Sequence, residues 1–185
     1  LMLSMLTEEP DAYLAQLQAA KLNDDVEVAH YAATAVAQIS KESDLKLQQL
    51  ERAFKTDPSA QNLNEYCDFL GEYLGSGLAE GRVAQIQRQQ YARLLARRCE
   101  REDTLELRIR YATALADVGQ IDEAQAVTDQ LVLDVPEEQK VWMLCLRLAV
   151  MRRDGDEVHR VIDAIDKQHV YLSAANREEL AFWRN

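Results

Sequence analysis

The chain has 185 residues and a formal net charge of −11, and it is poor in glycine, proline and aromatic residues. A net charge of this sign repels phosphate backbones and anionic lipids, which argues against a general nucleic-acid or membrane-surface binder. The abundance of Ala, Leu, Gln, Glu and Arg is typical of packed helices, so the composition predicts an all-α fold that can bury a core without disulfides or metals.

Helical periodicity runs through the whole chain, and short polar or glycine-containing segments interrupt it. The predicted helices cover residues 10–22, 26–40, 42–56, 62–74, 82–101, 105–118, 122–132, 137–153, 156–167 and 174–183. No segment alternates apolar and polar residues as a strand does. The pattern therefore predicts about ten helices in antiparallel pairs, arranged as an α-solenoid with a right-handed superhelical twist.

Helix-breaking residues divide this pattern into parts. Asn23-Asp24-Asp25 separates the first two helices, and Asp57-Pro58 ends the third because proline restricts the residue before it. The segment 75–81 contains three glycines and is the predicted hinge. We predict three parts of one continuous solenoid, which are residues 1–40, 41–102 and 103–185.

The clearest repeat signal follows the helix start at Leu105. Small and turn-forming residues stand at fixed offsets from it, namely Ala112, Gly119, Ala124 and Pro136. These offsets resemble positions 8, 15, 20 and 32 of the 34-residue tetratricopeptide (TPR) repeat. Tyr111 and Thr128 depart from the pattern, so this unit resembles a degenerate copy. The resemblance extends over residues 42–168, and the first two helices resemble one HEAT-type hairpin.

The TPR resemblance implies a role in holding other proteins, because that family shares binding rather than one reaction. In TPR domains the first helix of each pair carries most ligand contacts. On the helix that Thr104 caps, this singles out Arg108 and Tyr111. The resemblance implies stacked helix pairs with a concave face for a partner, no enzyme activity and no cofactor.

A narrower resemblance lies in the sequence DVEVAHYAATAV, a HEAT-like hairpin that leads into TPR-like helices. This arrangement is similar to the cytoplasmic region of the PelE family, membrane-anchored components of bacterial Pel exopolysaccharide machinery. The resemblance implies two membrane helices upstream and a scaffolding role in biofilm formation, beside a glycosyltransferase and a cyclic-di-GMP receptor at the inner membrane. A general cytoplasmic TPR adaptor and a helical-repeat RNA-binding module are the alternatives.

Residues 81–110 form a basic island, with a net charge of +4 against −9 for residues 1–80 and −6 for the remainder. Three interpretations stay open, which are pairing with the chain's own acidic helices, an acidic protein or peptide partner, and nucleic acid. The overall acidity favours protein partners over nucleic acid. The partner-binding residues predicted from the island and the TPR resemblance are Arg82, Arg88, Arg93, Arg97, Arg108 and Tyr111.

No catalytic or metal-binding motif is predicted. The glycine-containing segment 75–81 lacks both the preceding strand and the Gly-Lys-Ser/Thr of a phosphate loop. The three histidines, His30, His159 and His169, are scattered, and the acidic pairs stand at helix starts, where negative charge complements the helix dipole.

The three cysteines, Cys67, Cys99 and Cys145, are odd in number and widely spaced inside helical patterns. They suggest neither a disulfide framework nor a zinc site, and they fit a reducing, cytoplasmic setting. The chain starts Leu-Met-Leu, and its first apolar run is too short for a bilayer span or a signal peptide. We therefore expect an excerpt of a longer protein in which any membrane helices lie upstream.

Overall fold

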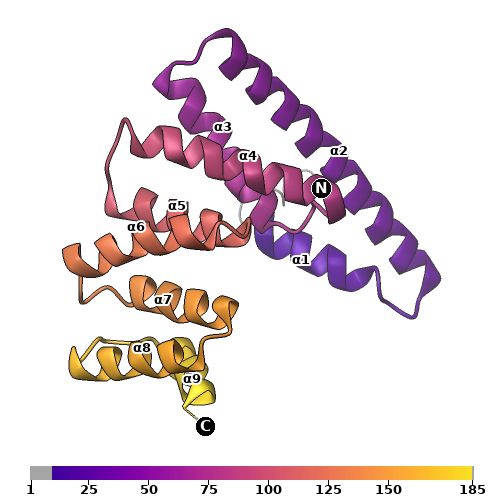
Figure 1. The fold of residues 1–185 in the computed structure, drawn as a ribbon. Helices are drawn as coiled ribbons and strands as arrows, with labels where there is room; N and C mark the ends of the chain where they lie inside the picture. The colour runs from indigo at the N-terminus through magenta and orange to yellow at the C-terminus, as the bar shows by residue number, and fades with distance from the viewer. Residues whose placement is uncertain (1–9, 185) are drawn as a thin grey trace. The chain divides into compact units, whose positions relative to one another are not determined.

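A computed structural model describes residues 10–184, which form helices joined by turns, with no strand in that range (Figure 1). The helices are α1 (Pro10–Ala20), α2 (Val26–Thr56), α3 (Ala60–Gly75), α4 (Gly81–Cys99), α5 (Leu105–Asp117), α6 (Ile121–Asp134), α7 (Gln139–Arg152), α8 (Gly155–Lys167) and α9 (Ala174–Trp183). The all-α prediction is confirmed, whereas the superhelical twist stays a prediction. The first apolar run, residues 1–9, lies outside the described residues.

One predicted helix boundary is wrong. The helices expected over 26–40 and 42–56 are a single helix, α2, of 31 residues. Its segment Ser40-Lys41-Glu42 contains no helix breaker, and the side-chain amide of Gln38 donates to the carboxylate of Glu42 at 2.6 Å across the expected break. Side chains four residues apart meet in this way only on an unbroken helix.

The chain divides into two compact units, residues 1–87 and residues 88–185. In the first unit, α2 packs against α1 and against α3. The carboxylate of Asp25 caps α2 by accepting from the backbone amides of Glu27 and Val28. The Tyr73 hydroxyl donates to the Asp44 carboxylate at 2.7 Å and so joins α3 to α2. Burial and this hydrogen bond raise the pKa of Tyr73 to about 12.

In the second unit, each helix from α5 to α9 packs against the next, as the lower part of Figure 1 shows. Ala112 on α5 and Ala124 on α6 are fully buried, in one apolar cluster with Leu144 and Leu148 of α7. Small side chains at this contact let the helices approach closely. The turn between α5 and α6 contains Gly119 at φ 79°, a left-handed conformation that glycine adopts without strain.

Helices α7, α8 and α9 share a second apolar cluster, centred on Leu146, Ile165 and Leu180. A polar link also joins α9 to α7, because the Gln139 side-chain oxygen accepts from the Ser173 backbone amide at 2.9 Å and from the Asn176 side chain at 3.0 Å. These contacts fix α9 relative to α7. They place the last helix where it lines a groove with α5 and α7.

Candidate functional site

A surface hollow with a mainly apolar lining lies on α5, α7 and α9, and we call it the α5–α7–α9 groove. Its volume is about 440 Å³. It is lined by Ile109, Thr113, Lys140, Met143, Leu144, Leu146, Arg147, Val150, Asn176, Glu179 and Trp183. Apolar side chains therefore form much of the groove's lining, and charged and amide groups lie beside them. This combination is usual for a protein-binding surface.

The helices present different faces to the core and to this groove. On α5, Ala112 faces the buried cluster, whereas Ile109 and Thr113 are half-buried and line the groove. The Thr113 hydroxyl donates to the Ile109 backbone carbonyl of its own helix at 2.8 Å, so that the hydroxyl is already satisfied. On α7, the Arg147 guanidinium forms an ion pair with Asp117 of α5.

A second hollow adjoins the groove at Val150 and Trp183. These two residues also line that hollow, of about 380 Å³, with Val158 of α8 and the turn between α7 and α8. Two adjoining hollows suit an extended or helical segment better than a compact small molecule.

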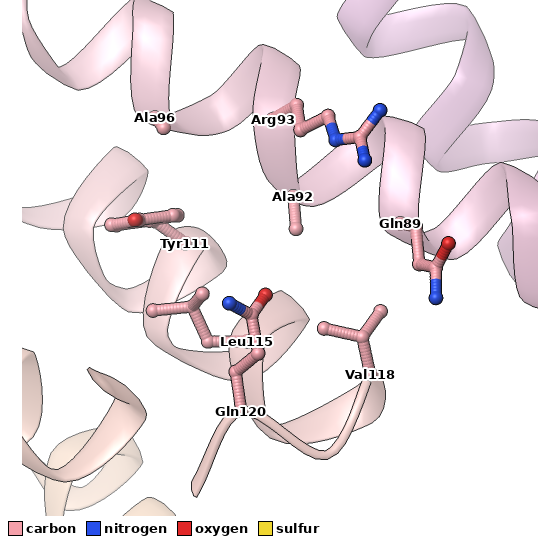
Figure 2. A pocket seen from close by; sticks show the side chains of 8 residues that line it. All are labelled: Gln89, Ala92, Arg93, Ala96, Tyr111, Leu115, Val118 and Gln120. Atoms are coloured by element: carbon pink, nitrogen blue, oxygen red, sulfur yellow. The ribbon is translucent and has the colours of Figure 1, made fainter. Parts of the chain in front are cut away.

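A different hollow lies between α4 and α5, and we call it the α4–α5 cleft (Figure 2). Its volume is about 380 Å³. It is lined by Gln89, Ala92, Arg93, Ala96, Tyr111, Leu115, Val118 and Gln120. Two of the predicted partner-binding residues, Arg93 on α4 and Tyr111 on α5, line this cleft from opposite walls in Figure 2.

The remaining predicted residues lie elsewhere. Arg82, Arg88 and Arg97 are exposed on α4 and do not line the cleft. Arg108 is half-buried, and its guanidinium donates to the Asp134 carboxylate at 2.6 Å, with Asp103 at 3.8 Å. This hydrogen bond lowers the pKa of Asp134. Arg108 therefore fits the interpretation in which the arginines of the island pair with acidic neighbours.

One contact between α4 and α5 comes from an arginine that the sequence did not single out. The Arg110 guanidinium donates to the Tyr91 hydroxyl at 2.9 and 3.1 Å and lies near the ring of the same residue. Arg98 also belongs to the basic island, and it is buried. Some arginines of the island therefore contact the rest of the fold, whereas Arg93 is exposed.

The electrostatics of the cleft keep Tyr111 neutral. Burial raises the pKa of the Tyr111 phenol, and the nearby Cys99, Glu123 and Glu100 raise it further. A neutral phenol retains its proton and can donate a hydrogen bond to an acceptor in the cleft. Arg93, by contrast, carries a fixed positive charge, because a guanidinium does not deprotonate in proteins.

Sequence reasoning missed several groove and cleft residues. Trp183 was predicted only as the end of the helix over 174–183, and nothing local in the sequence places it in one hollow with Ile109 and Met143. Gln120 precedes α6 but makes no side-chain cap there, which sequence patterns do not reveal. The available signal was the expectation that first helices of pairs bind ligands, which predicts ligand contacts on α5.

Within residues 10–184, no group of three His, Cys, Asp or Glu side chains is placed to hold a metal ion. In the same range, no helix combines the length and apolar character of a bilayer span. Comparison with known proteins gives no match to a family model, a curated protein or a solved structure. The functional argument therefore rests on the groove and the cleft.

Proposed function

We propose that the chain is a non-catalytic scaffold that holds a segment of a partner protein in the α5–α7–α9 groove. The observation that carries this proposal is the groove itself, an apolar hollow that a second hollow adjoins at Val150 and Trp183. A partner segment that covers these side chains removes apolar area from water, which is the main driving force of association. The lining groups Lys140, Asn176 and Glu179 would orient it through hydrogen bonds.

The TPR resemblance supports the same location. Under that resemblance α5 and α7 are first helices of successive pairs, the helices that carry most ligand contacts in the family, whereas α9 lies beyond the range 42–168 that the resemblance covers. Full burial of Ala112 and Ala124, at two of the small-residue positions, is compatible with such pairs. A right-handed superhelix of these pairs is part of the proposal.

Two substitutions test the groove by affinity purification of the full chain from its native cells. Thr113→Arg fills the groove without removing a core side chain, since Thr113 is only half-buried. The matched control is Leu133→Arg on α6, because Leu133 is 76% exposed and outside the groove. We expect Thr113→Arg to lose the co-purifying partner and Leu133→Arg to keep it. Equal retention by both variants contradicts the proposal, provided that circular dichroism shows both to be folded.

The finer proposal is that this scaffold belongs to an exopolysaccharide synthesis and export complex at the inner face of the cell membrane. It rests on the PelE resemblance of the α1–α2 region alone. Crosslinking of the full-length protein in native cells, followed by fractionation and mass spectrometry, tests it separately. Recovery with a membrane-bound glycosyltransferase supports the finer proposal. Recovery from the cytosol with other partners contradicts it and leaves the groove proposal standing as that of a general adaptor.

A further inference from the structure

The α4–α5 cleft has a charge that differs from that of the chain as a whole. The chain carries a net charge of −11, yet Arg93 is the only charged side chain among the cleft residues. Arg93 is exposed, and no described residue forms an ion pair with it. A guanidinium at the edge of a hollow without a carboxylate lining favours an anionic ligand.

The other polar groups of the cleft are neutral hydrogen-bonding groups. Gln89 and Gln120 bring carboxamides, and Tyr111 brings a phenol whose raised pKa keeps it protonated. Gln120 occupies the N-cap position of α6 without making a cap hydrogen bond, and Figure 2 shows its carboxamide extending into the cleft. Its bond to Glu123 is long, at 3.5 Å. These groups suit a ligand that has both carboxylates and peptide groups.

The apolar part of the cleft leaves room for a peptide. Ala92 and Ala96 on α4 present only methyl groups, opposite Leu115 and Val118. Larger side chains at the two alanines would fill the space between the helices. A narrow apolar floor with polar groups along its edges fits an extended chain segment, which offers alternating side chains and backbone groups.

The acidic groups around the cleft limit where the ligand's charge can lie. Glu100 and Glu123 are close enough to Tyr111 to raise its pKa. A ligand carboxylate would therefore be repelled at the Tyr111 end and attracted at the Arg93 end. A polyphosphate backbone needs several cations along its path, which these acidic neighbours oppose. A short acidic peptide that places one carboxylate at Arg93 avoids the repulsion at the Tyr111 end and needs only this one cation.

From this arrangement we propose that the α4–α5 cleft is a second docking site, which binds an acidic peptide segment of a partner protein through Arg93, with hydrogen bonds from Gln89, Gln120 and Tyr111. This site is separate from the α5–α7–α9 groove. Either site can fail its test without affecting the other.

The test uses the full, isotopically labelled chain. The probe is a short acetylated peptide amide with one glutamate among alanines, and the same peptide with glutamine in place of the glutamate is the uncharged control. We expect the glutamate peptide, but not the glutamine peptide, to shift the side-chain amide signals of Gln89 and Gln120 in a saturable manner. Arg93→Glu should weaken the affinity about tenfold at low salt. Arg88→Glu is the matched control, because Arg88 is exposed on the same helix outside the cleft and its reversal changes the net charge equally.

We expect Arg88→Glu to weaken the affinity by no more than about twofold, since only screened, longer-range attraction is lost. Arg93→Gln provides a second variant that removes the charge without reversing it, and circular dichroism checks the folding of each. Absence of saturable shifts in the wild-type chain overturns the proposal. So does an equal loss in the two reversal variants, because the whole island and not the cleft would then attract the probe. Tighter binding of oligouridine at the same signals identifies nucleic acid as the occupant and overturns it as well.

Discussion

Helix α2 of the first unit and helix α7 of the second differ in how they are stabilised. Helix α2 has 31 residues, yet its buried side chains are only Ala32, Leu47 and Phe54. Helix α7 has 14 residues and buries seven side chains. Short helices are marginal on their own and depend on tertiary packing, whereas a long helix gains more from its own backbone hydrogen bonds. The second unit is therefore the better candidate for a rigid binding surface.

The largest expected effect tests the continuity of α2. Lys41 is exposed in the middle of this helix, at the position where the sequence pattern predicted a break. Lys41→Pro removes a backbone donor and places the ring against the preceding turn, so we expect unfolding to become easier by about 3 kcal/mol. Chemical denaturation measures this value, with Lys41→Ala as the control. A loss below about 1 kcal/mol would show that the chain breaks there, as two separate helices require.

A smaller change in stability is expected from replacing one glycine in each unit by alanine. Gly119 in the α5–α6 turn has φ 79°, and no atom of a neighbour would meet an added Cβ. Gly119→Ala should therefore cost about 1–2 kcal/mol through backbone strain alone. Gly75 ends α3 in a helical conformation with equally open surroundings. Gly75→Ala should stabilise the chain by about 0.5 kcal/mol, because alanine restricts the unfolded chain. Similar values for the two substitutions would contradict the left-handed turn at Gly119.

The smallest expected loss of stability concerns the link between α2 and α3. Tyr73→Phe removes the hydrogen bond to Asp44, so we expect a loss of about 1 kcal/mol at neutral pH by denaturant titration. The variant should also differ at high pH. Burial, with Asp44, raises the Tyr73 pKa from 10.0 to about 12, so the folded state keeps a proton that the unfolded state loses. The stabilisation is complete below pH 10 and disappears as the pH rises through 12.

The wild-type free energy of unfolding should accordingly fall faster than that of Tyr73→Phe above pH 10, by up to about 1.4 kcal/mol per pH unit. Parallel pH profiles for the two proteins would mean that Tyr73 is solvated and that α3 is not joined to α2 through it.

Helix boundaries were predictable where the residues themselves prevent a helix. Pro58 and Gly119 mark real ends, because proline lacks a donor and glycine adopts a left-handed turn. The expected break at Lys41 lies in a short polar segment, and no residue there opposes the helix. A polar segment therefore needs a helix-breaking residue before it can mark a boundary.

The candidate surfaces were predictable only in part. The charge pattern indicated Arg93, and the repeat pattern indicated Tyr111, but their meeting in one cleft depends on how α4 and α5 pack. Trp183 lines the groove because Gln139 ties α9 to α7, a contact between residues far apart in the sequence. Contacts of this range leave no periodic signal in one sequence.

Site-specific photocrosslinking in the native cells tests whether the α5–α7–α9 groove holds a partner segment. A photoreactive residue at Met143 lies within the groove, and one at Leu133 lies on the exposed side of α6. We expect position 143 to capture one continuous segment of one partner, position 133 to capture none, and Thr113→Arg to abolish the capture. Capture of the same partner from position 133 alone, or from both positions regardless of Thr113→Arg, would contradict the groove proposal.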